Sequence, residues 1–432
     1  MSAWKNRGMD PAAVELLLSQ RGSDLLASLP PYEESQALAL SQRLRDDGVE
    51  PALAAAALTQ SRLRARAAAK LGTRATSMLF TQAGLEQATR GVVASLHAQR
   101  YTAAGVHHVA DLTAGIGTDS LALAEAGLRV TACEIDEATA LVVRHNLRQH
   151  AHAEVVHGDG LSLDLDGHDV DGLFADPARR TGSGTRIFDP HAYQPPLDAV
   201  WTLRDRVPAV GIKVGPGVPH HGLPDDAEAE WVSVDGDVVE AGLWFGPLAP
   251  EGPGRGATVL RQGPDGLRRA RLHATAGTAA PPAAVVAGPG SLGGYLFEPD
   301  GAVIRAGLVG PLALEHGARL LDPTIAYLTG DGPVPAVDGV PVASAYRVLD
   351  VMPFHLKRLK AYLRERKVGT LTVKKRGTAV VPEELRSRLA LSGPASATVV
   401  LTRVAGSQQV LVVDPVLDPS RSPSPRSPEE VR

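Results

Sequence analysis

Residues 109–127 read Val-Ala-Asp-Leu-Thr-Ala-Gly-Ile-Gly-Thr-Asp-Ser-Leu-Ala-Leu-Ala-Glu-Ala-Gly, and this segment specifies the fold of the chain. An apolar run that ends at Asp111 predicts a buried parallel strand. Residues 113–117 predict a tight glycine turn, and residues 119–126 predict a helix. Glycine lets the backbone approach a ligand closely, and the amides at a helix N-terminus are free to bind one. The segment therefore predicts a strand, a glycine loop and a helix around a ligand.

Charge in this loop limits the kind of ligand. The dinucleotide fingerprint has a glycine or alanine three residues after its second glycine, where this chain has Ser120. Asp119 lies in the first helical turn, where a carboxylate would repel a pyrophosphate. These residues favour a ligand with a positive centre, and S-adenosylmethionine carries a sulfonium and an ammonium. A purely structural glycine turn in a doubly wound protein remains the alternative on these residues alone.

Acidic residues end the strands that follow. The predicted strands cover residues 128–136, 153–159, 170–177 and 209–214, with a helix over 138–150. Glu134 falls 23 positions after Asp111, close to the spacing at which a carboxylate meets ribose hydroxyls. Asp159 and Asp176 end the next two strands. Each of these acids alone could be just a polar strand end. Four acids at the carboxyl ends of four strands, Asp111 included, instead indicate a ligand crevice at the carboxyl edge of an open α/β sheet.

The order Asp-Leu-Thr-Ala-Gly-Ile-Gly-Thr-Asp, Glu-Ile-Asp, Gly-Asp-Gly and Asp-Pro-Ala-Arg-Arg resembles the class I S-adenosylmethionine-dependent methyltransferases, in particular a bacterial branch with a C-terminal THUMP-like domain. The resemblance covers most of the chain and implies a doubly wound, Rossmann-like α/β sheet with S-adenosylmethionine as the cofactor. It implies that the cofactor-binding residues are Asp111, Thr113, Gly115, Gly117, Glu134, Ile135, Asp159 and Asp176. In such enzymes the residues that match Asp111, Gly115 and Gly117 line the methionine part of the cofactor. The match to Glu134 holds the ribose, and the match to Asp159 holds adenine. The match to Asp176 lies beside the methyl group.

The expected catalytic residues are Asp176, Pro177 and Arg179. Enzymes that methylate amino groups of nucleic acids usually place an aromatic residue after the Asp-Pro segment, where it stacks on a flipped base. This chain has Ala178 and Arg179 instead, so methylation of a base amino group is not indicated. A planar guanidinium at Arg179 can stack on a base or bind phosphate, and a solvated surface loop is the alternative.

Composition limits the class of protein. A chain of 432 residues with 44% hydrophobic residues predicts several domains with a substantial core. A single cysteine, Cys133, excludes an internal disulfide and fits a reducing cytoplasm. No apolar run approaches the roughly 20 residues that cross a bilayer, and the N-terminus lacks the apolar core of a signal peptide. We expect a cytoplasmic protein with no membrane partner, and the adjacent histidine pairs predict no metal site.

The pattern along the chain predicts five parts. These are an N-terminal helical domain (1–100), a class I methyltransferase domain (101–273), a small ferredoxin-like α/β module (285–345), a basic THUMP-like domain (346–415) and a disordered tail (416–432). The ferredoxin-like and THUMP-like descriptions come from the resemblance. Hairpin signals near residues 235 and 264 are expected to complete an antiparallel edge of the main sheet. Pro353 is expected to begin a helix with a buried stripe of Leu356, Leu359 and Leu363.

Charge is unevenly distributed. Residues 346–414 hold 13 Lys and Arg against 5 Asp and Glu, whereas residues 1–345 hold 28 against 40. The cations expected to bind RNA phosphates are Lys357, Arg358, Lys374, Lys375 and Arg376. Charge kept only for solubility is the alternative.

Together these features predict an S-adenosylmethionine-dependent methyltransferase of structured RNA, such as rRNA or tRNA. A methyltransferase of a small molecule or protein, or a non-catalytic RNA-binding protein, remains open. The sequence fixes neither the modified atom nor the oligomeric state.

Overall fold

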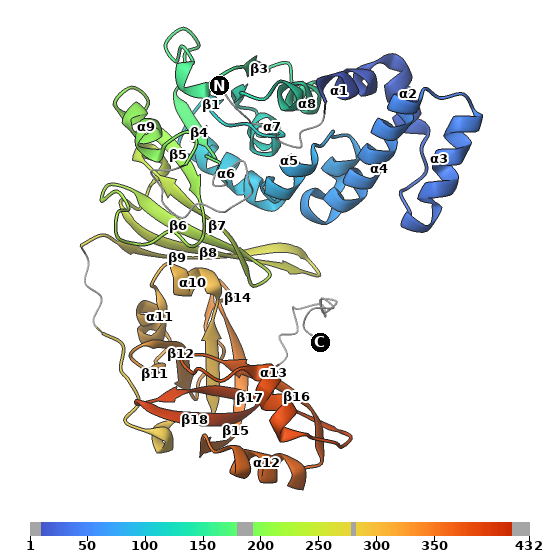
Figure 1. The fold of residues 1–432 in the computed structure, drawn as a ribbon. Helices are drawn as coiled ribbons and strands as arrows, with labels where there is room; N and C mark the ends of the chain where they lie inside the picture. Colours follow the sequence, from blue (N-terminus) through green and yellow to red (C-terminus); the bar gives the residue numbers. More distant parts are fainter. Residues whose placement is uncertain (1–9, 179–192, 278–281, 417–432) are drawn as a thin grey trace. The chain divides into compact units, whose positions relative to one another are not determined.

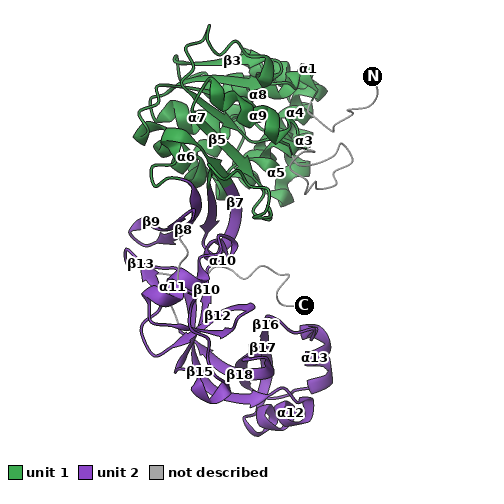
Figure 2. Cartoon of the chain, turned by 90° about the vertical axis from the view of Figure 1, so that its left-hand side faces the viewer, with its two compact units in different colours: residues 1–228, 242–252 green, residues 229–241, 253–432 purple. Residues whose placement is uncertain are grey.

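The computed structural model describes residues 10–178, 193–277 and 282–416 (Figure 1). The chain divides into two compact units (Figure 2). Unit 1 comprises Met1–Glu228 and Gly242–Gly252, and unit 2 comprises Ala229–Ala241 and Pro253–Arg432. In the described part of the chain, no helix combines the length and the apolar character that crossing a bilayer requires.

Helices dominate the chain before its first strand, as the spacing of apolar residues predicts. They are α1 (Pro11–Leu18), α2 (Gln20–Ser28), α3 (Ala37–Asp46), α4 (Pro51–Leu71), α5 (Gln82–Gln87) and α6 (Gly91–Ala103). The carboxylate of Asp10 caps α1 by accepting from the amide of Ala12, and Pro11 occupies the first turn, where its missing N–H costs nothing. Gly72 ends α4 with a positive φ of 60°, a conformation that glycine adopts readily.

A short connector, Met78–Phe80, ties these helices to the residues around the glycine loop. Gln60 of α4 donates to the carbonyl of Phe80 at 2.7 Å and accepts from its amide at 3.0 Å. Asn146 bonds both backbone groups of Leu79 and also donates to the carbonyl of Ile116 at 2.8 Å. Two buried amide side chains thus satisfy backbone groups that would otherwise lie unpaired in the core.

The first part of the main sheet is parallel, as the alternation of strands and helices predicts. Its elements are β1 (His108–Asp111), α7 (Thr118–Glu125), β2 (Arg129–Glu134), α8 (Glu137–Leu147), β3 (Ala153–His157), β4 (Gly172–Ala175), α9 (Leu197–Trp201) and β5 (Ala209–Val214). Strand β1 pairs in parallel with both β2 and β4, and β2–β3 and β4–β5 are also parallel. The order β3-β2-β1-β4-β5 places the topological switch between β1 and β4, where doubly wound sheets bind their ligands. The predicted doubly wound α/β fold is confirmed.

Hairpin strands follow where the turn signals predict them: β6 (Glu228–Val234), β7 (Asp237–Trp244), β8 (Gly254–Gly263) and β9 (Gly266–Thr275). The full order of this nine-stranded sheet is β3-β2-β1-β4-β5-β7-β6-β8-β9. Strands β8 and β9 pair antiparallel along their whole length.

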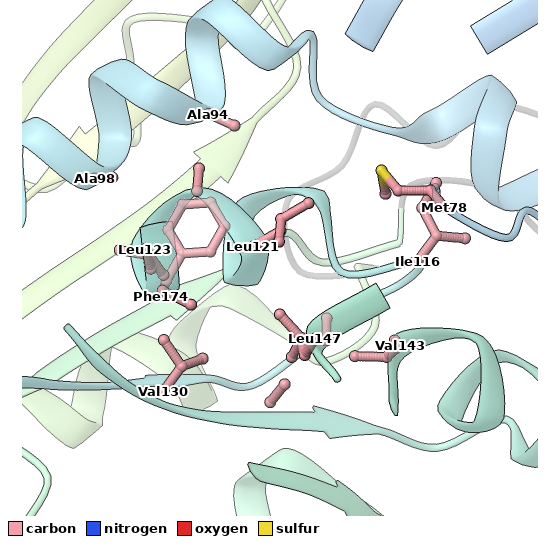
Figure 3. Close-up of a cluster of buried hydrophobic side chains, with 14 of the residues drawn as sticks. Met78, Ala94, Ala98, Ile116, Leu121, Leu123, Val130, Val143, Leu147 and Phe174 are labelled. Atoms are coloured by element: carbon pink, nitrogen blue, oxygen red, sulfur yellow. The ribbon is translucent and has the colours of Figure 1, made fainter. Parts of the chain in front are cut away.

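The core of unit 1 packs around β1, β2 and β4 (Figure 3). Phe174 of β4, Val130 of β2 and Leu121 of α7 belong to one buried cluster, and Met78 of the connector joins it. Burying each such side chain contributes on the order of 1.5–3 kcal/mol. The sheet and its helices are therefore closely packed where the glycine loop leaves β1.

Unit 2 contains a second, seven-stranded sheet with the order β11-β12-β10-β15-β18-β17-β16. Its elements are β10 (Tyr295–Pro299), α10 (Gly301–Arg305), α11 (Val309–Glu315), β11 (Arg319–Asp322), β12 (Ile325–Gly330), β15 (Ala343–Pro353), α12 (Leu356–Glu365), β16 (Val368–Lys375), α13 (Pro382–Leu389), β17 (Ala395–Val404) and β18 (Ser407–Pro415). A two-stranded sheet of β13 (Ala336–Val337) and β14 (Val340–Pro341) lies between β12 and β15 in the sequence.

Two details of this region differ from the sequence prediction. The boundary expected between residues 345 and 346 falls inside β15, which pairs with β10 at one end and with β18 at the other. The strands on either side of that boundary therefore share one sheet. The helix expected to begin at Pro353 begins at Leu356, because residues 351–353 still pair with β18. Its buried Leu359 and Leu363 are as predicted, with Leu356 packed against the same core.

Candidate functional site

The glycine loop joins the carboxyl end of β1 to α7. Gly115 and Gly117 have φ angles of 57° and 79°, in the left-handed region that L residues rarely adopt. A Cβ at Gly117 would also lie 3.2 Å from Cγ1 of Val143, whereas one at Gly115 would meet no atom within 4 Å. The loop therefore packs tightly against α8 at Gly117 and has open space at Gly115.

Asp111 lies at the end of β1 and is 1% exposed. Its carboxylate accepts from the hydroxyl of Ser120 at 2.6 Å and from the amide of Thr113 at 3.2 Å. Burial raises the pKa of Asp111 to about 7, because the low dielectric disfavours the charged form. Ser120, the residue that departs from the dinucleotide fingerprint, thus binds the carboxylate of Asp111 through its hydroxyl.

Glu134 lies at the end of the neighbouring strand, β2. One carboxylate oxygen accepts from the amide of Gly115 at 2.9 Å, and the other accepts from the amide of Asp136 at 2.9 Å. Burial raises the pKa of Glu134. Since a carboxylate oxygen has two lone pairs, each oxygen can accept one further hydrogen bond. The next residue, Ile135, is 72% exposed and presents an apolar surface beside the acid.

Asp159 follows β3 and caps a short turn by accepting from the amide of Leu161 at 3.0 Å. The adjacent Gly160 lies against the end of β1, since a Cβ there would come within 2.3 Å of the carbonyl oxygen of Leu112. Backbone contact thus brings the turn after β3 next to the loop after β1, and Asp159 itself is exposed.

Asp176 follows β4. Its amide donates to the hydroxyl of Thr113 at 2.6 Å, and its carboxylate lies 2.6 Å from the ammonium of Lys213. Pro177 is buried, and the backbone of Ala178 pairs with that of Gln194. Arg179, the third expected catalytic residue, lies outside the described residues.

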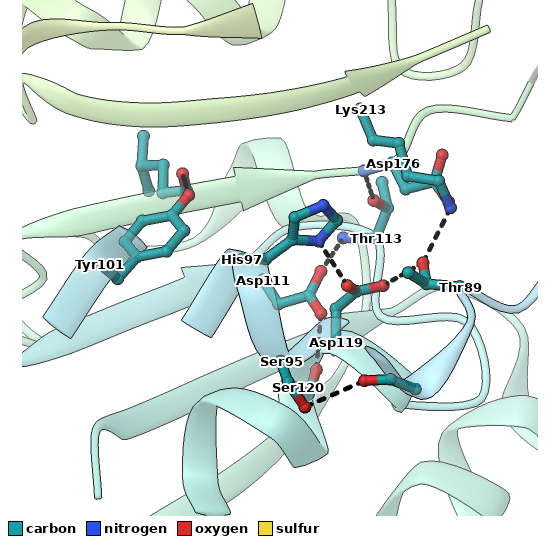
Figure 4. Close-up of polar contacts among 12 residues, drawn as sticks. Thr89, Ser95, His97, Tyr101, Asp111, Thr113, Asp119, Ser120, Asp176 and Lys213 are labelled. Carbon is teal, nitrogen blue, oxygen red and sulfur yellow. Dashed lines mark hydrogen bonds and ion pairs between the residues drawn. The ribbon is translucent and has the colours of Figure 1, made fainter. Parts of the chain in front are cut away.

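Figure 4 shows a network of buried polar side chains, missed by sequence reasoning, that is linked to Asp176 through Lys213. Lys213 of β5 donates to the hydroxyl of Thr89 at 2.8 Å, and Thr89 donates to Asp119 at 2.6 Å. The other oxygen of Asp119 lies 2.8 Å from Nδ1 of His97. Burial raises the pKa of Asp119. The hydrogen bond and charge of His97 oppose this effect, as do Lys213 and Thr89, and the pKa of Asp119 is lower than its usual value.

The role expected of Asp119 therefore needs correction. It was expected to repel an anion at the glycine loop, but its carboxylate is buried and engaged by Thr89 and His97. One signal for this network is present in the sequence: Lys213 interrupts the otherwise apolar strand Ala-Val-Gly-Ile-Lys-Val, an unusual place for an ammonium.

The five cations expected to bind RNA phosphates fall into two groups. Lys374 and Arg376, at the end of β16, both pair with Glu298 of β10, at 2.7 Å and 3.5 Å. Their cations also lie over the rings of Tyr346 and Tyr327 at 5.2 Å and 5.1 Å. Burial lowers the pKa of Lys374, but the Glu298 carboxylate has the opposite effect, and the pKa is raised above its ordinary value. Two of the five cations expected to bind RNA phosphates are therefore engaged by an acid.

The second group lies on α12 and just beyond it. Exposed cations here are Lys357, Arg358, Arg364, Arg366 and Lys367, and Lys375 of β16 is also exposed. Lys357 and Arg358 form no ion pair with any described residue, whereas Arg366 stacks on Tyr362 with 3.6 Å between its Cζ and the ring centroid. We call Lys357, Arg358, Arg364, Arg366, Lys367 and Lys375 the α12 basic surface.

Comparisons with known proteins agree with this arrangement. A family described as THUMP domain-like matches residues 343–415, and a domain of unknown function matches residues 10–67. The chain is 35% identical over 380 residues to proteins of two Mycobacterium tuberculosis strains, CDC 1551 / Oshkosh and ATCC 25618 / H37Rv. Both are described as uncharacterized S-adenosylmethionine-dependent methyltransferases, and the match covers 83% of this chain and 95% of theirs.

A crystal structure of a methyltransferase from Porphyromonas gingivalis W83 shares the fold, with a TM-score of 0.66 at 21% identity. The match covers 89% of this chain and 99% of that one. With the fold, the strand-end acids and these relatives together, the chain belongs to the S-adenosylmethionine-dependent methyltransferases.

Proposed function

We propose that this methyltransferase transfers the methyl group of S-adenosylmethionine to structured RNA, such as rRNA or tRNA. The observation that carries the proposal is the charge of residues 346–414, where 13 cations stand against 5 acids in a chain whose first 345 residues are acidic. Positive surfaces of this kind attract the phosphate backbone without reading its sequence.

The residues at the carboxyl ends of β1, β2 and β3 fit the cofactor. Glu134 has lone pairs for the two ribose hydroxyls, and the open space at Gly115 leaves room for the backbone to approach a ligand. Exposed Ile135 is suited to pack against the adenine ring, and Asp159 to accept from its amino group. Asp111, which accepts from the amide of Thr113, is suited to supply negative charge for the methionine ammonium, because a bound cation lowers the pKa that burial raises.

Asp176 is suited to orient the acceptor. S-adenosylmethionine supplies a methyl group on a positively charged sulfur, which an incoming nucleophile displaces in line. The protein therefore contributes mainly by positioning the acceptor. Asp176 is fixed through its backbone by Thr113 and through one carboxylate oxygen by Lys213. Its side chain remains 25% exposed, so it can accept a hydrogen bond from the acceptor group.

The α12 basic surface is suited to bind phosphate. Lys357 and Arg358 lie in the first turn of α12, where the helix dipole already carries partial positive charge. Cations at the N-terminal end of a helix are repelled by this partial positive charge. An anion bound there offsets the repulsion. This arrangement favours a phosphate partner over charge that only maintains solubility.

The test is transfer of a radiolabelled methyl group to total RNA isolated from cells in which the gene has been deleted. We expect label in the RNA, and digestion to nucleosides identifies the modified nucleotide. Label that appears only in protein or small-molecule fractions would identify a different acceptor. RNA binding with no label in any fraction would identify a binding protein without this activity.

A further inference from the structure

Lys213 occupies a position that packing does not explain. Strand β5 is buried at every residue from Ala209 to Val214, and it lies between β4 and β7 in the sheet. The Lys213 side chain is only 6% exposed. Burying an ammonium costs several kcal/mol unless it is paired and hydrogen-bonded, so an apolar residue would be the default here.

Two contacts of the Lys213 ammonium lie at the candidate active site. Its ammonium lies 2.6 Å from one carboxylate oxygen of Asp176 and donates to Thr89 at 2.8 Å. Thr89 in turn donates to Asp119, which is paired with His97 of α6. The ring of His97 also lies against two aromatic rings of the core: its centroid is 5.3 Å from that of Phe174 and 5.4 Å from that of Trp244. The hydrogen-bonded side chains that lead from Lys213 therefore end at a residue that is fixed in the core.

The geometry leaves one oxygen of Asp176 for a partner. Lys213 occupies Oδ2, and the Asp176 amide is bound to Thr113. Within the described residues, Oδ1 accepts no hydrogen bond, and a quarter of the side chain is exposed. A carboxylate held at its backbone and at one oxygen presents the other oxygen in a fixed direction.

We infer that Lys213 is a positioning residue for methyl transfer: it holds Oδ2 of Asp176 so that Oδ1 faces the acceptor, and the Thr89–Asp119–His97 chain holds the ammonium in place. The inference rests on the proposed function only in assuming that Asp176 meets the acceptor. A misplacement of about 1 Å in such a group can cost on the order of 100-fold in rate.

The experiment compares Lys213→Met, which keeps the length of the side chain without its charge, with Lys213→Arg, which keeps a donor. Lys70→Met is the matched control. Lys70 is a half-buried lysine whose pKa is lowered to about 8, first by burial and then by the nearby charge of Lys213. Its ammonium donates to the backbone carbonyls of Leu85 and Glu86 and not to Asp176, so this variant removes a neighbouring charge without removing the contact. Each variant is assayed for kcat and KM with deletion-strain total RNA, for cofactor Kd by calorimetry, and for melting temperature.

We expect Lys213→Met to lose on the order of 100-fold in kcat, with KM for RNA and Kd for S-adenosylmethionine nearly unchanged. Lys213→Arg should recover part of the loss, and Lys70→Met should stay near the wild-type rate. A purely structural role would instead lower the melting temperature and leave kcat of the folded fraction intact. An unchanged kcat in folded Lys213→Met overturns the inference.

A second arm separates this inference from the proposed function. If the wild type transfers no methyl group to RNA, the proposed function fails, and crystal structures of wild type and Lys213→Met still decide the inference. We expect the Asp176 carboxylate to rotate in the variant, and an unchanged carboxylate overturns the proposal. If Lys213→Met does not fold, Thr89→Val replaces it, with Thr89→Ser as the variant that retains the hydroxyl.

Discussion

Glu134 accepts two backbone amides and has two further lone pairs, so its removal should affect cofactor binding directly. We expect Glu134→Ala to weaken S-adenosylmethionine by roughly 1–3 kcal/mol, because charge-assisted hydrogen bonds to the ribose are lost. Calorimetry measures the change. Glu137→Ala, which removes an exposed acid three residues later, is the control and should bind normally. Equal affinity in folded Glu134→Ala would mean that the ribose is held elsewhere.

Cys133 and Asp176 should differ sharply in their effect on rate. Burial raises the pKa of Cys133 to about 12, so it stays a thiol near neutral pH and is a poor nucleophile. We expect Cys133→Ala to keep near wild-type activity, whereas Asp176→Ala loses roughly 100- to 10,000-fold with cofactor affinity nearly intact. Rapid-quench assays of methyl transfer measure both. A covalent adduct between RNA and Cys133 would contradict this expectation.

The pKa of Asp111, raised to about 7 by burial, has a consequence for stability. Between about pH 4 and pH 7 the folded protein binds more protons at this group than the unfolded chain does. This contribution to the free energy of unfolding is therefore present at low pH and is lost as pH rises through 7. The free energy of unfolding falls by up to about 1.4 kcal/mol per pH unit over this range. We expect Asp111→Asn to reduce the fall in unfolding free energy between pH 5 and 8, measured with denaturant. Parallel curves for the two proteins would rule this out.

At the scale of elements, the two groups of C-terminal cations should bind RNA differently. Lys357→Ala/Arg358→Ala and Lys374→Ala/Arg376→Ala each remove two positive charges. Since Lys374 and Arg376 already pair with Glu298, we expect only the α12 double variant to lower the salt dependence of RNA binding strongly. Its log–log slope should fall by about 1.4–1.8, at 0.7–0.9 per lost phosphate contact. Equal slopes for the two variants would mean that the Glu298 pairs open on binding.

The sequence predicts elements well where the determining residues are close together. Gly115 and Gly117 signal the turn before α7, and the Asp235-Gly-Asp turn between two apolar runs signals the hairpin of β6 and β7. Pairings between distant residues are not visible in the same way. Lys213 and Thr89 are 124 positions apart, and Lys374 and Glu298 are 76 apart. Only the packing of elements that are distant in the sequence brings such groups within bonding distance.

The same limit explains the errors in the C-terminal region. Pro353 is a good first helical residue, but strand pairing with β18 continues through it. Lys374, Lys375 and Arg376 look equivalent as a run of three cations, yet Glu298 engages the first and third and leaves Lys375 exposed. Tertiary contacts, rather than local propensity, decide both outcomes.

At the scale of the whole molecule, charge and chemistry lie in different parts of the chain. The strand-end acids and the Lys213–Thr89–Asp119–His97 chain belong to unit 1, whereas the α12 basic surface belongs to unit 2. If RNA is the acceptor, loss of the basic surface should weaken capture of RNA without changing the chemical step. This separation predicts an effect on KM and none on kcat.

The most direct test is therefore the single-turnover rate of methyl transfer to deletion-strain total RNA, measured for wild type and for Lys357→Ala/Arg358→Ala at limiting and at saturating RNA. We expect the wild type to label RNA. The variant should be slower at limiting RNA and should reach the wild-type rate at saturation. Equal rates at every RNA concentration would contradict capture of RNA by the α12 basic surface. Label found only in protein or small molecules would contradict the assignment of this enzyme to RNA.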